Sequence, residues 1–212
     1  MSAAKASRRR PLFGRIYPKM AAAMDERGMT ERRRELLAGL GGEVVEVGAG
    51  HGVNFTHYPA EVTRVVAVEP RLRERAAAAE TAVPVDVVPG VAGHLPVADA
   101  SVDGVVFCMV LCSLPDVGAA LTEARRVLKP GGQLRFLEHE RAGTSGLARV
   151  QDVLDATIWP LMVGGCHLGR DAEAAIRRAG FRVDRLDRFL FPPARTPFSF
   201  HLLGTAVRAG DE

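Results

Sequence analysis

Short apolar runs alternate along the chain with longer segments in which apolar and charged positions recur at helical spacing. The apolar runs are rich in valine, as in Val62–Val68, and turn-forming residues end them, as Pro70 does there. Strands that alternate with helices indicate a parallel sheet covered on both faces. Five runs are predicted as strands: 43–47, 62–68, 85–88, 102–110 and 133–138.

The segments between these runs are predicted as helices. Thr30 is expected to cap one of them at its N-terminus, and the run Lys129-Pro130-Gly131-Gly132 is expected to end another. The predicted helices span residues 12–27, 30 to the glycines at 39–42, 71–81, 116–128, 146–159 and 171–179.

Two further strands, 181–191 and 201–208, follow each other without a helix between them, so they are expected to pair antiparallel. We therefore expect an α/β fold with a doubly wound, mostly parallel seven-stranded sheet and a C-terminal antiparallel hairpin. Residues 1–42 are expected to form a basic tail with helices, and residues 43–212 the main domain.

Composition narrows the class of protein. The chain has 212 residues, of which 47% are hydrophobic, and this suits one folded domain. The net charge of +3 is too small to indicate nucleic acid as a partner. No apolar run reaches the roughly 20 residues of a membrane span. Three cysteines cannot form a disulfide framework, so a reducing, cytoplasmic setting is expected.

The loop after the first predicted strand carries the most specific chemistry. It reads Glu46-Val47-Gly48-Ala49-Gly50-His51-Gly52, and alternating glycines let a ligand lie against bare main chain. A dinucleotide fingerprint would need glycine where Val53 stands, and the lysine of a phosphate-binding loop is absent. An acid at the mouth of the loop would repel pyrophosphate but suits an ammonium group.

The second strand ends in another acid, Glu69. A carboxylate at this position accepts hydrogen bonds from the two hydroxyls of a ribose. An adenosine joined to a cationic amino-acid tail satisfies both acids, and S-adenosylmethionine is such a ligand.

At this point the chain resembles the class I S-adenosylmethionine-dependent methyltransferases, which have a Rossmann-like fold. The resemblance covers residues 43 to 140 and rests on four motifs in order: Glu46-x-Gly48-x-Gly50-x-Gly52, Val66-Ala67-Val68-Glu69-Pro70, Leu95-Pro96-x-x-x-x-Ser101-x-Asp103, and Arg126-Val127-Leu128-Lys129-Pro130-Gly131-Gly132.

The resemblance implies the roles of individual residues. It places Gly48, Ala49 and Gly50 against the methionine part of the cofactor and Glu69 on the ribose. Val91 stands where the superfamily often has aspartate, which leaves adenine recognition to backbone and apolar walls. With Tyr17, which we expect in a helical lid over the cofactor, the cofactor site expected as a whole comprises Tyr17, Glu46, Gly48, Ala49, Gly50, Gly52, Asn54, Glu69, Pro70, Arg71, Val91, Ala92 and Cys108.

A narrower resemblance points to the methyl acceptor. Asn54-Phe55, Val110-Leu111-Cys112-Ser113, Glu138-His139 and Gly165-Cys166-His167-Leu168-Gly169-Arg170 are similar to motifs of methyltransferase-like family seven, which are alkyl-thiol S-methyltransferases. Those proteins normally carry a membrane-anchoring N-terminal helix, whereas this chain starts with an arginine-rich tail. The resemblance thus implies an apolar small-molecule thiol as the favoured acceptor, and the different N-terminus indicates that this acceptor is soluble.

Other functions stay open at this point. The Leu-Pro motif and the fourth strand also resemble O-, N- or C-methyltransferases of quinones and secondary metabolites. A non-catalytic module that binds S-adenosylmethionine and a nucleic-acid methyltransferase are further alternatives, the latter disfavoured by charge. Whether the chain forms a homo-oligomer is also open.

Three residues are candidates for the catalytic chemistry. His139 follows the fifth strand, at the ligand-binding edge of such sheets, and an imidazole there accepts the proton of a thiol or hydroxyl. Glu138 is expected to orient His139 or to hold the ammonium group of the cofactor, and His167 to cover the pocket from a loop. The Cys108/Cys112 pair invites a metal or arsenic interpretation, but two thiols on one apolar segment are usually core residues, so no metal is predicted.

Overall fold

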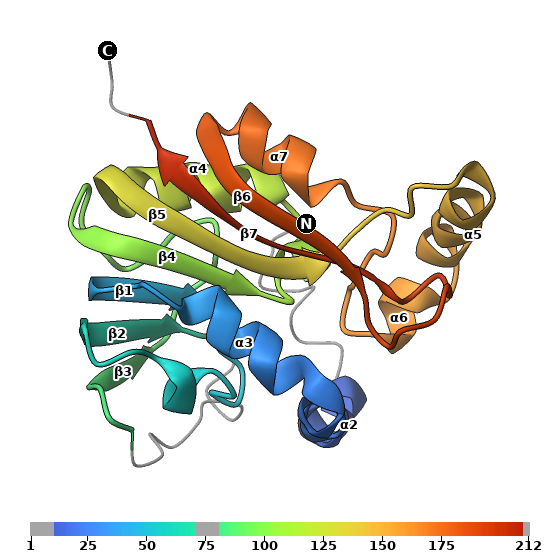
Figure 1. Cartoon of the computed structure of the whole chain (residues 1–212), viewed down its shortest axis with the longest axis horizontal. Coiled ribbons are helices and arrows are strands. Elements are labelled where there is room, and N and C mark those ends of the chain that lie inside the picture. The colour runs from blue at the N-terminus through green and yellow to red at the C-terminus, as the bar shows by residue number, and fades with distance from the viewer. Residues whose placement is uncertain (1–10, 71–80, 210–212) are drawn as a thin grey trace.

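A computed structural model describes residues 11–70 and 81–209, and at positions 11–15 and 17 only the backbone (Figure 1). The strands form one sheet in the order β3-β2-β1-β4-β5-β7-β6. β1 to β5 run parallel, and β7 pairs antiparallel with both β5 and β6, which confirms the predicted fold. The strands are β1 Gly42–Val47, β2 Val62–Val68, β3 Val85–Val88, β4 Val102–Cys108, β5 Leu128–His139, β6 Phe181–Leu190 and β7 Phe200–Arg208.

Helices cover both faces of this sheet, which is why valine fills its central strands. Side chains that alternate along one strand enter different cores: Val45 packs with α4 and α7, and Val44 with α3. The helices are α2 Pro11–Met24, α3 Thr30–Leu37, α4 Val117–Val127, α5 Ser145–Ala156, α6 Trp159–Met162 and α7 Ala172–Arg178. Within the described residues, none of them is long and apolar enough to cross a bilayer.

The prediction that Thr30 caps a helix is wrong. Its backbone is already helical, with φ −51° and ψ −44°, and the N-cap position of α3 is taken by Met29, whose side chain makes no capping hydrogen bond. The chain kinks between α2 and α3 at Gly28, which has a φ of 109°. The Thr30 hydroxyl instead donates to the carbonyl of Asp25 at 3.4 Å. The helix predicted at 71–81 falls almost entirely outside the described residues.

Several element ends differ from the prediction. β4 stops at Cys108 because Met109 has a positive φ of 58°. β5 begins at Leu128 rather than residue 133, since Leu128 pairs with Val102 before an irregularity in the register. The helix predicted at 146–159 divides into α5 and α6, because Thr157 leaves helical geometry with φ −119° and ψ −101°.

Candidate functional site

β1 runs directly into a bend made of glycines. Gly48, Gly50 and Gly52 have φ values of 70°, 54° and 75°, all in the left-handed region. A Cβ on Gly48 would lie 2.8 Å from Cγ2 of Val110, closer than atoms pack. The main chain of the bend therefore stays bare, and it lies against the turn that follows β4.

Glu69 stands at the end of β2, beside this bend. Its carboxylate accepts a hydrogen bond from the backbone N–H of Gly50 at 3.0 Å, and the residue is 6% exposed. The two features that the sequence singled out, the glycine bend and the acid of the second strand, are thus joined directly in the structure. Pro70, which follows, is exposed, and Arg71 lies outside the described residues.

Glu46, near the end of β1, is buried and accepts two side-chain hydrogen bonds. Asn54 Nδ2 and the Tyr58 hydroxyl each donate to it at 2.8 Å. Burial raises the pKa of the Glu46 carboxyl to about 7, although these donors and the charge of Arg33 act in the opposite direction. Glu46 and Asn54 therefore belong to one buried network next to the bend.

Arg33 of α3 completes this network, and the sequence interpretation missed it. The residue is 1% exposed, and its guanidinium donates to Asp25 at 2.9 Å, to Asn54 Oδ1 at 3.1 Å and to Cys108 Sγ at 3.1 Å. Burial raises the pKa of the Cys108 thiol to about 11, so this cysteine stays protonated. A helix outside residues 43–212 thus reaches the carboxyl ends of β1 and β4.

A signal for Arg33 was present in the sequence. It stands four residues after Met29 and three before Leu36, on the stripe of α3 that faces the sheet. A charged residue on such a stripe indicates a buried partner. The three consecutive arginines at 32–34 hid this signal, because a basic run usually marks a solvated face.

The remaining predicted cofactor residues occupy different surroundings. Val91 is 50% exposed and forms a small bridge with His94, and the partly buried Ala92 packs against the core that contains α4 and α7. The side chain of Tyr17, in α2, lies outside the described part of the structure.

Glu138, near the end of β5, is fully buried and anchors the turn after β4. One carboxylate oxygen accepts the backbone N–H groups of Val110 and Leu111 at 2.8 Å, and the other accepts that of Cys112 at 3.2 Å. Burial raises its pKa to about 7, against the effect of these donors. The carboxylate is therefore engaged with backbone groups rather than hydrogen-bonded to His139.

His139 lies next to two cysteines. Its Nδ1 is 3.4 Å from Cys166 Sγ, and the ligand atoms of His139, Cys112 and Cys166 lie within 4.8 Å of one another. The hydrogen bond from Cys112 and the nearby His139 lower the pKa of Cys166, while the pKa of Cys112 is raised. The close cysteine pair is thus Cys112 and Cys166, not the Cys108/Cys112 pair that the sequence suggested.

The third catalytic candidate, His167, comes from the loop that carries Cys166. Its Nδ1 is 2.8 Å from the carbonyl of Gly165, and its backbone N–H donates to the carbonyl of Cys112 at 2.8 Å. The loop is therefore tied to the turn after β4.

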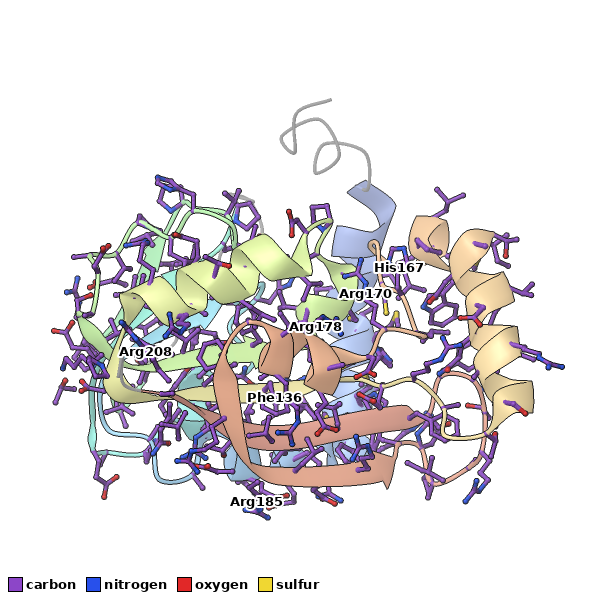
Figure 2. All side chains as sticks on the ribbon, turned by 90° about the horizontal axis from the view of Figure 1, so that it is seen from above. Phe136, His167, Arg170, Arg178, Arg185 and Arg208 are labelled. Atoms are coloured by element: carbon purple, nitrogen blue, oxygen red, sulfur yellow. The ribbon has the colours of Figure 1, made fainter. Side chains whose placement is uncertain are left out.

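A cavity of 280 Å³ opens beside His139 and Cys112. Its far wall comes from α7 and the loop before it, through Arg170 and Arg178, which Figure 2 labels. The remaining lining residues are Leu111, Val117, Asp171, Ala172 and Ala175. The cavity thus lies next to the carboxyl ends of β4 and β5.

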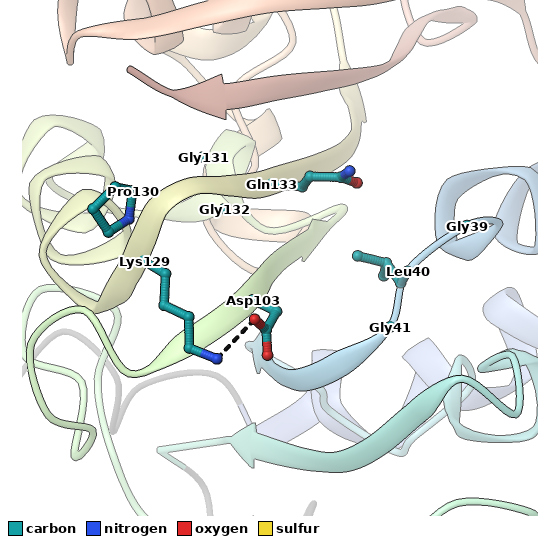
Figure 3. Close-up of a pocket in the computed structure, with 9 residues that line it drawn as sticks. All are labelled: Gly39, Leu40, Gly41, Asp103, Lys129, Pro130, Gly131, Gly132 and Gln133. Atoms are coloured by element: carbon teal, nitrogen blue, oxygen red, sulfur yellow. Dashed lines mark hydrogen bonds and ion pairs between the residues drawn. The ribbon is translucent and has the colours of Figure 1, made fainter. Parts of the chain in front are cut away.

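A second cavity, of 250 Å³, lies at the opposite edge of the sheet (Figure 3). Gly39–Gly41 and residues 129–133 line it, and Lys129 pairs there with Asp103 at 2.7 Å. Open α/β sheets bind ligands at the carboxyl ends of their strands, whereas this cavity is at the amino ends. The glycine bend, Glu69 and His139 instead all belong to the carboxyl-end edge.

Comparisons with known proteins agree with this geometry. A family model described as a methyltransferase domain matches residues 45–136. The thiol S-methyltransferase TMT1A of Homo sapiens is 34% identical over 196 residues, which cover 85% of this chain and 80% of that protein. The thiol S-methyltransferase TMT1B of Rattus norvegicus is 33% identical over 218 residues, which cover 93% and 88%.

Two other comparisons show less, the first because it matches only half of this chain and the second because its low sequence identity shows the fold alone. The ubiquinone/menaquinone biosynthesis C-methyltransferase UbiE of Caulobacter vibrioides is 40% identical over 107 residues, only 50% of this chain and 39% of that protein. A solved methyltransferase from Thermotoga maritima, titled a possible histamine N-methyltransferase, shares the fold with a TM-score of 0.68 at 21% identity, covering 92% of this chain and 97% of that one.

The first two matches decide the family, because each relative is more than 30% identical over most of both chains. The chain is an S-adenosylmethionine-dependent methyltransferase and belongs to the thiol S-methyltransferase family that includes TMT1A and TMT1B.

Proposed function

We propose that this enzyme transfers the methyl group of S-adenosylmethionine to the sulfur of a small, apolar thiol. The observation that carries the proposal is the reach of the similarity to the thiol S-methyltransferases, 80% to 88% of their length. The similarity to the quinone-pathway enzyme covers half of this chain. The similarity that covers more of the chain therefore favours the thiol.

The glycine bend suits the methionine part of the cofactor. Gly48, Ala49 and Gly50 offer bare main chain, and a side chain at Gly50 would have open space in front of it, since the nearest heavy atom lies 4.0 Å from a Cβ built there. Glu69 offers a buried carboxylate beside the bend for the ribose hydroxyls. These features fit the cofactor.

Other residues complete the proposed cofactor site. Glu46, whose carboxyl accepts a hydrogen bond from Asn54, lies next to the bend and in its ionised form is proposed to attract the ammonium group. Gly52 belongs to the bend. Pro70, Arg71, Val91 and Ala92 are proposed to lie beside the adenine, and the main chain of Cys108 beside the methionine part. Residues 1–42, with Tyr17, are proposed to form a lid over this site.

Thiol methylation needs little from the protein beyond alignment and a dry pocket. The cofactor supplies an electrophilic methyl group on a sulfonium. Attack by a thiolate cancels charge, so a pocket that excludes water favours it. A free thiol has a pKa near 8.5, so modest help suffices to remove its proton.

We assign that help to His139, which borders the 280 Å³ cavity. Glu138 acts as a positioning residue, since it fixes the backbone of Val110–Cys112 next to the cavity. His167 belongs to the loop that covers the same region. We also propose that the enzyme works in the cytoplasm on a small molecule and without nucleic acid, because its cysteines are free thiols and its net charge is small.

Acceptors that differ only in the accepting atom test the proposal. The full chain is incubated with methyl-labelled S-adenosylmethionine and a six-carbon alkyl thiol, alcohol or amine, with a phenol and a quinol in parallel. We expect label in the methyl thioether, with one S-adenosylhomocysteine formed per methyl transferred. Transfer to the phenol or quinol with none to the thiol would refute the thiol assignment and leave the methyltransferase class intact.

A further inference from the structure

Two sulfur atoms and one imidazole nitrogen converge at the carboxyl end of β5. They belong to Cys112, Cys166 and His139, and all three lie within 4.8 Å of one another. A tetrahedral Zn²⁺ with normal bond lengths sets its sulfur and nitrogen ligands about 3.6 Å apart and two sulfurs about 3.8 Å apart. The 3.4 Å between Cys166 Sγ and His139 Nδ1 is already close to the first of these values.

The segment that carries Cys112 is fixed in place. Cys112 lies in a 3₁₀ turn, Leu111–Ser113, whose backbone N–H groups are held by the buried carboxylate of Glu138. That turn is also bound from the other side, because Arg170 donates to the carbonyl of Leu111 at 2.6 Å. The thiol of Cys112 is therefore held by a rigid support, as ligands of metal sites are.

The segment that carries Cys166 is fixed in a comparable way. Gly164 and Gly165, with φ values of 58° and 97°, turn the chain after α6 so that Cys166 faces the cluster. Both oxygens of Asp155 then accept backbone N–H groups of Leu168 and Gly169, at 2.7 and 2.8 Å. The short loop is thus clamped on both sides of the cysteine.

The surroundings suit a soft cation. Cys112 and Cys166 are each 3% exposed and pack with Leu168, Leu154 and Trp159. Buried cysteines often serve only as small apolar residues. An imidazole nitrogen within hydrogen-bonding distance of a sulfur adds a nitrogen donor, and two thiolates with one imidazole select Zn²⁺-like ions over Mg²⁺ or Ca²⁺.

We propose that Cys112, Cys166 and His139 bind a divalent cation of the Zn²⁺ type, with a fourth position open to the adjoining cavity. Three protein ligands and one open position are the pattern of catalytic zinc sites. Resting on the proposed function, we assign the fourth position to the acceptor thiol. The S–H bond breaks as the metal–sulfur bond forms, and the proton leaves to solvent.

Methyl transfer then follows without any further reactant. A bond forms between the acceptor sulfur and the methyl carbon, the bond from that carbon to the sulfonium breaks, and its electron pair stays on the cofactor sulfur. In this arrangement His139 promotes loss of the thiol proton through the ion rather than by taking the proton itself. The neutral thioether product binds the ion more weakly than a thiolate.

Cobalt substitution tests the site without any need for activity. The full chain is purified with a phosphine reductant, stripped with a chelator and titrated with Co²⁺. We expect one ion per chain with sulfur-to-cobalt charge-transfer absorption, displaced by Zn²⁺. Cys112→Ser and Cys166→Ser should each weaken Co²⁺ binding at least tenfold and reduce the charge-transfer absorption. His139→Gln should weaken Co²⁺ binding but leave the charge-transfer absorption of the bound ion in place, because both sulfur ligands remain. Cys108→Ser, outside the cluster, should bind Co²⁺ as the unchanged chain does.

Binding of less than one ion per chain, or full binding in both Cys112→Ser and Cys166→Ser, would overturn the site. Adding a six-carbon thiol to the cobalt protein should increase the charge-transfer absorption, and the matching alcohol should not; an unchanged spectrum would overturn the open position. Thiol methylation by a chain that binds no ion would refute this inference alone. Cobalt and thiol binding without thiol methylation would refute the proposed function alone.

Discussion

The carboxylate of Glu69 accepts a hydrogen bond from the backbone N–H of Gly50 at 3.0 Å. This contact joins the end of β2 to the bend after β1, two strands that pair side by side in the sheet. A ligand held by both would therefore meet one connected surface.

Glu69→Ala should weaken binding of S-adenosylhomocysteine by about 1.5–3 kcal/mol, the range for hydrogen bonds to a charged group. Glu69→Gln should lose less, because an amide oxygen still accepts the N–H of Gly50. Calorimetry measures both, and Glu61→Ala, at an exposed position, serves as the control. Unchanged affinity in Glu69→Ala would contradict the ribose assignment.

Gly50→Val should abolish cofactor binding, because its side chain would enter the space proposed for the methionine part. Gly50 has a positive φ, so backbone strain alone must be separated from this effect. Gly131→Val provides that control, since Gly131 has φ 77° with nothing within 4 Å of a Cβ and lies at the opposite edge. Equal loss of affinity in both variants would argue against the proposed position of the cofactor.

Arg33→Ala should destabilise the protein by about 1–3 kcal/mol, because it leaves the buried amide oxygen of Asn54 and the partly buried carboxylate of Asp25 without their donor. Arg34→Ala, one position along and 56% exposed, should change stability by less than about 0.5 kcal/mol. Urea unfolding compares the two. Similar values for both variants would show that the Arg33 network contributes little.

Glu46 makes stability depend on pH. Burial raises its pKa from 4.5 to about 7 in the folded protein, so between these values the folded state holds a proton that the unfolded state releases. Stability is therefore lost as pH rises through this window, by up to roughly 3 kcal/mol. Glu46→Gln removes this contribution.

The measurement is urea unfolding of the unchanged chain and Glu46→Gln at pH 5 and pH 8. The variant should gain stability relative to the unchanged chain at pH 8 and gain much less at pH 5. Other titrating groups are common to both proteins and cancel in the difference. A difference that does not vary with pH would show that Glu46 is ionised throughout.

His139→Gln should lower kcat by about 100-fold or more, the usual contribution of a group that moves a proton or activates a nucleophile. The affinity for S-adenosylhomocysteine should stay within about twofold, because the residue borders the acceptor cavity rather than the glycine bend. Steady-state kinetics with a thiol acceptor and calorimetry separate the two quantities. A variant with normal turnover would make His139 a purely structural residue.

Much of the fold could be predicted from local patterns. β2 and β3 begin and end where their valine runs do, and Asp116 and Asp171 cap α4 and α7 through their side chains. These features depend on residues close in sequence, so the periodicity of hydrophobic residues and the capping residues at helix ends are enough to predict them. The acids Glu46 and Glu69 stand out as candidates for the same reason, since each stands at the end of a recognisable strand.

The rest depends on long-range contacts. Arg33 is buried because α3 packs against the sheet, where its guanidinium meets Asn54 and Cys108, and no pattern within the helix specifies these partners. Cys112 and Cys166 are far apart in sequence and meet only when the loop after α6 folds onto the turn after β4. The thiols that looked paired in sequence, Cys108 and Cys112, instead enter different clusters.

The proposed cofactor site is decided by a crystal structure of the full chain soaked with S-adenosylhomocysteine. We expect the ribose hydroxyls on Glu69, the homocysteine chain along Gly48–Gly50, and its sulfur toward the cavity that His139 borders. A crevice left empty by that compound, or the compound bound elsewhere on the sheet, would contradict the proposed site.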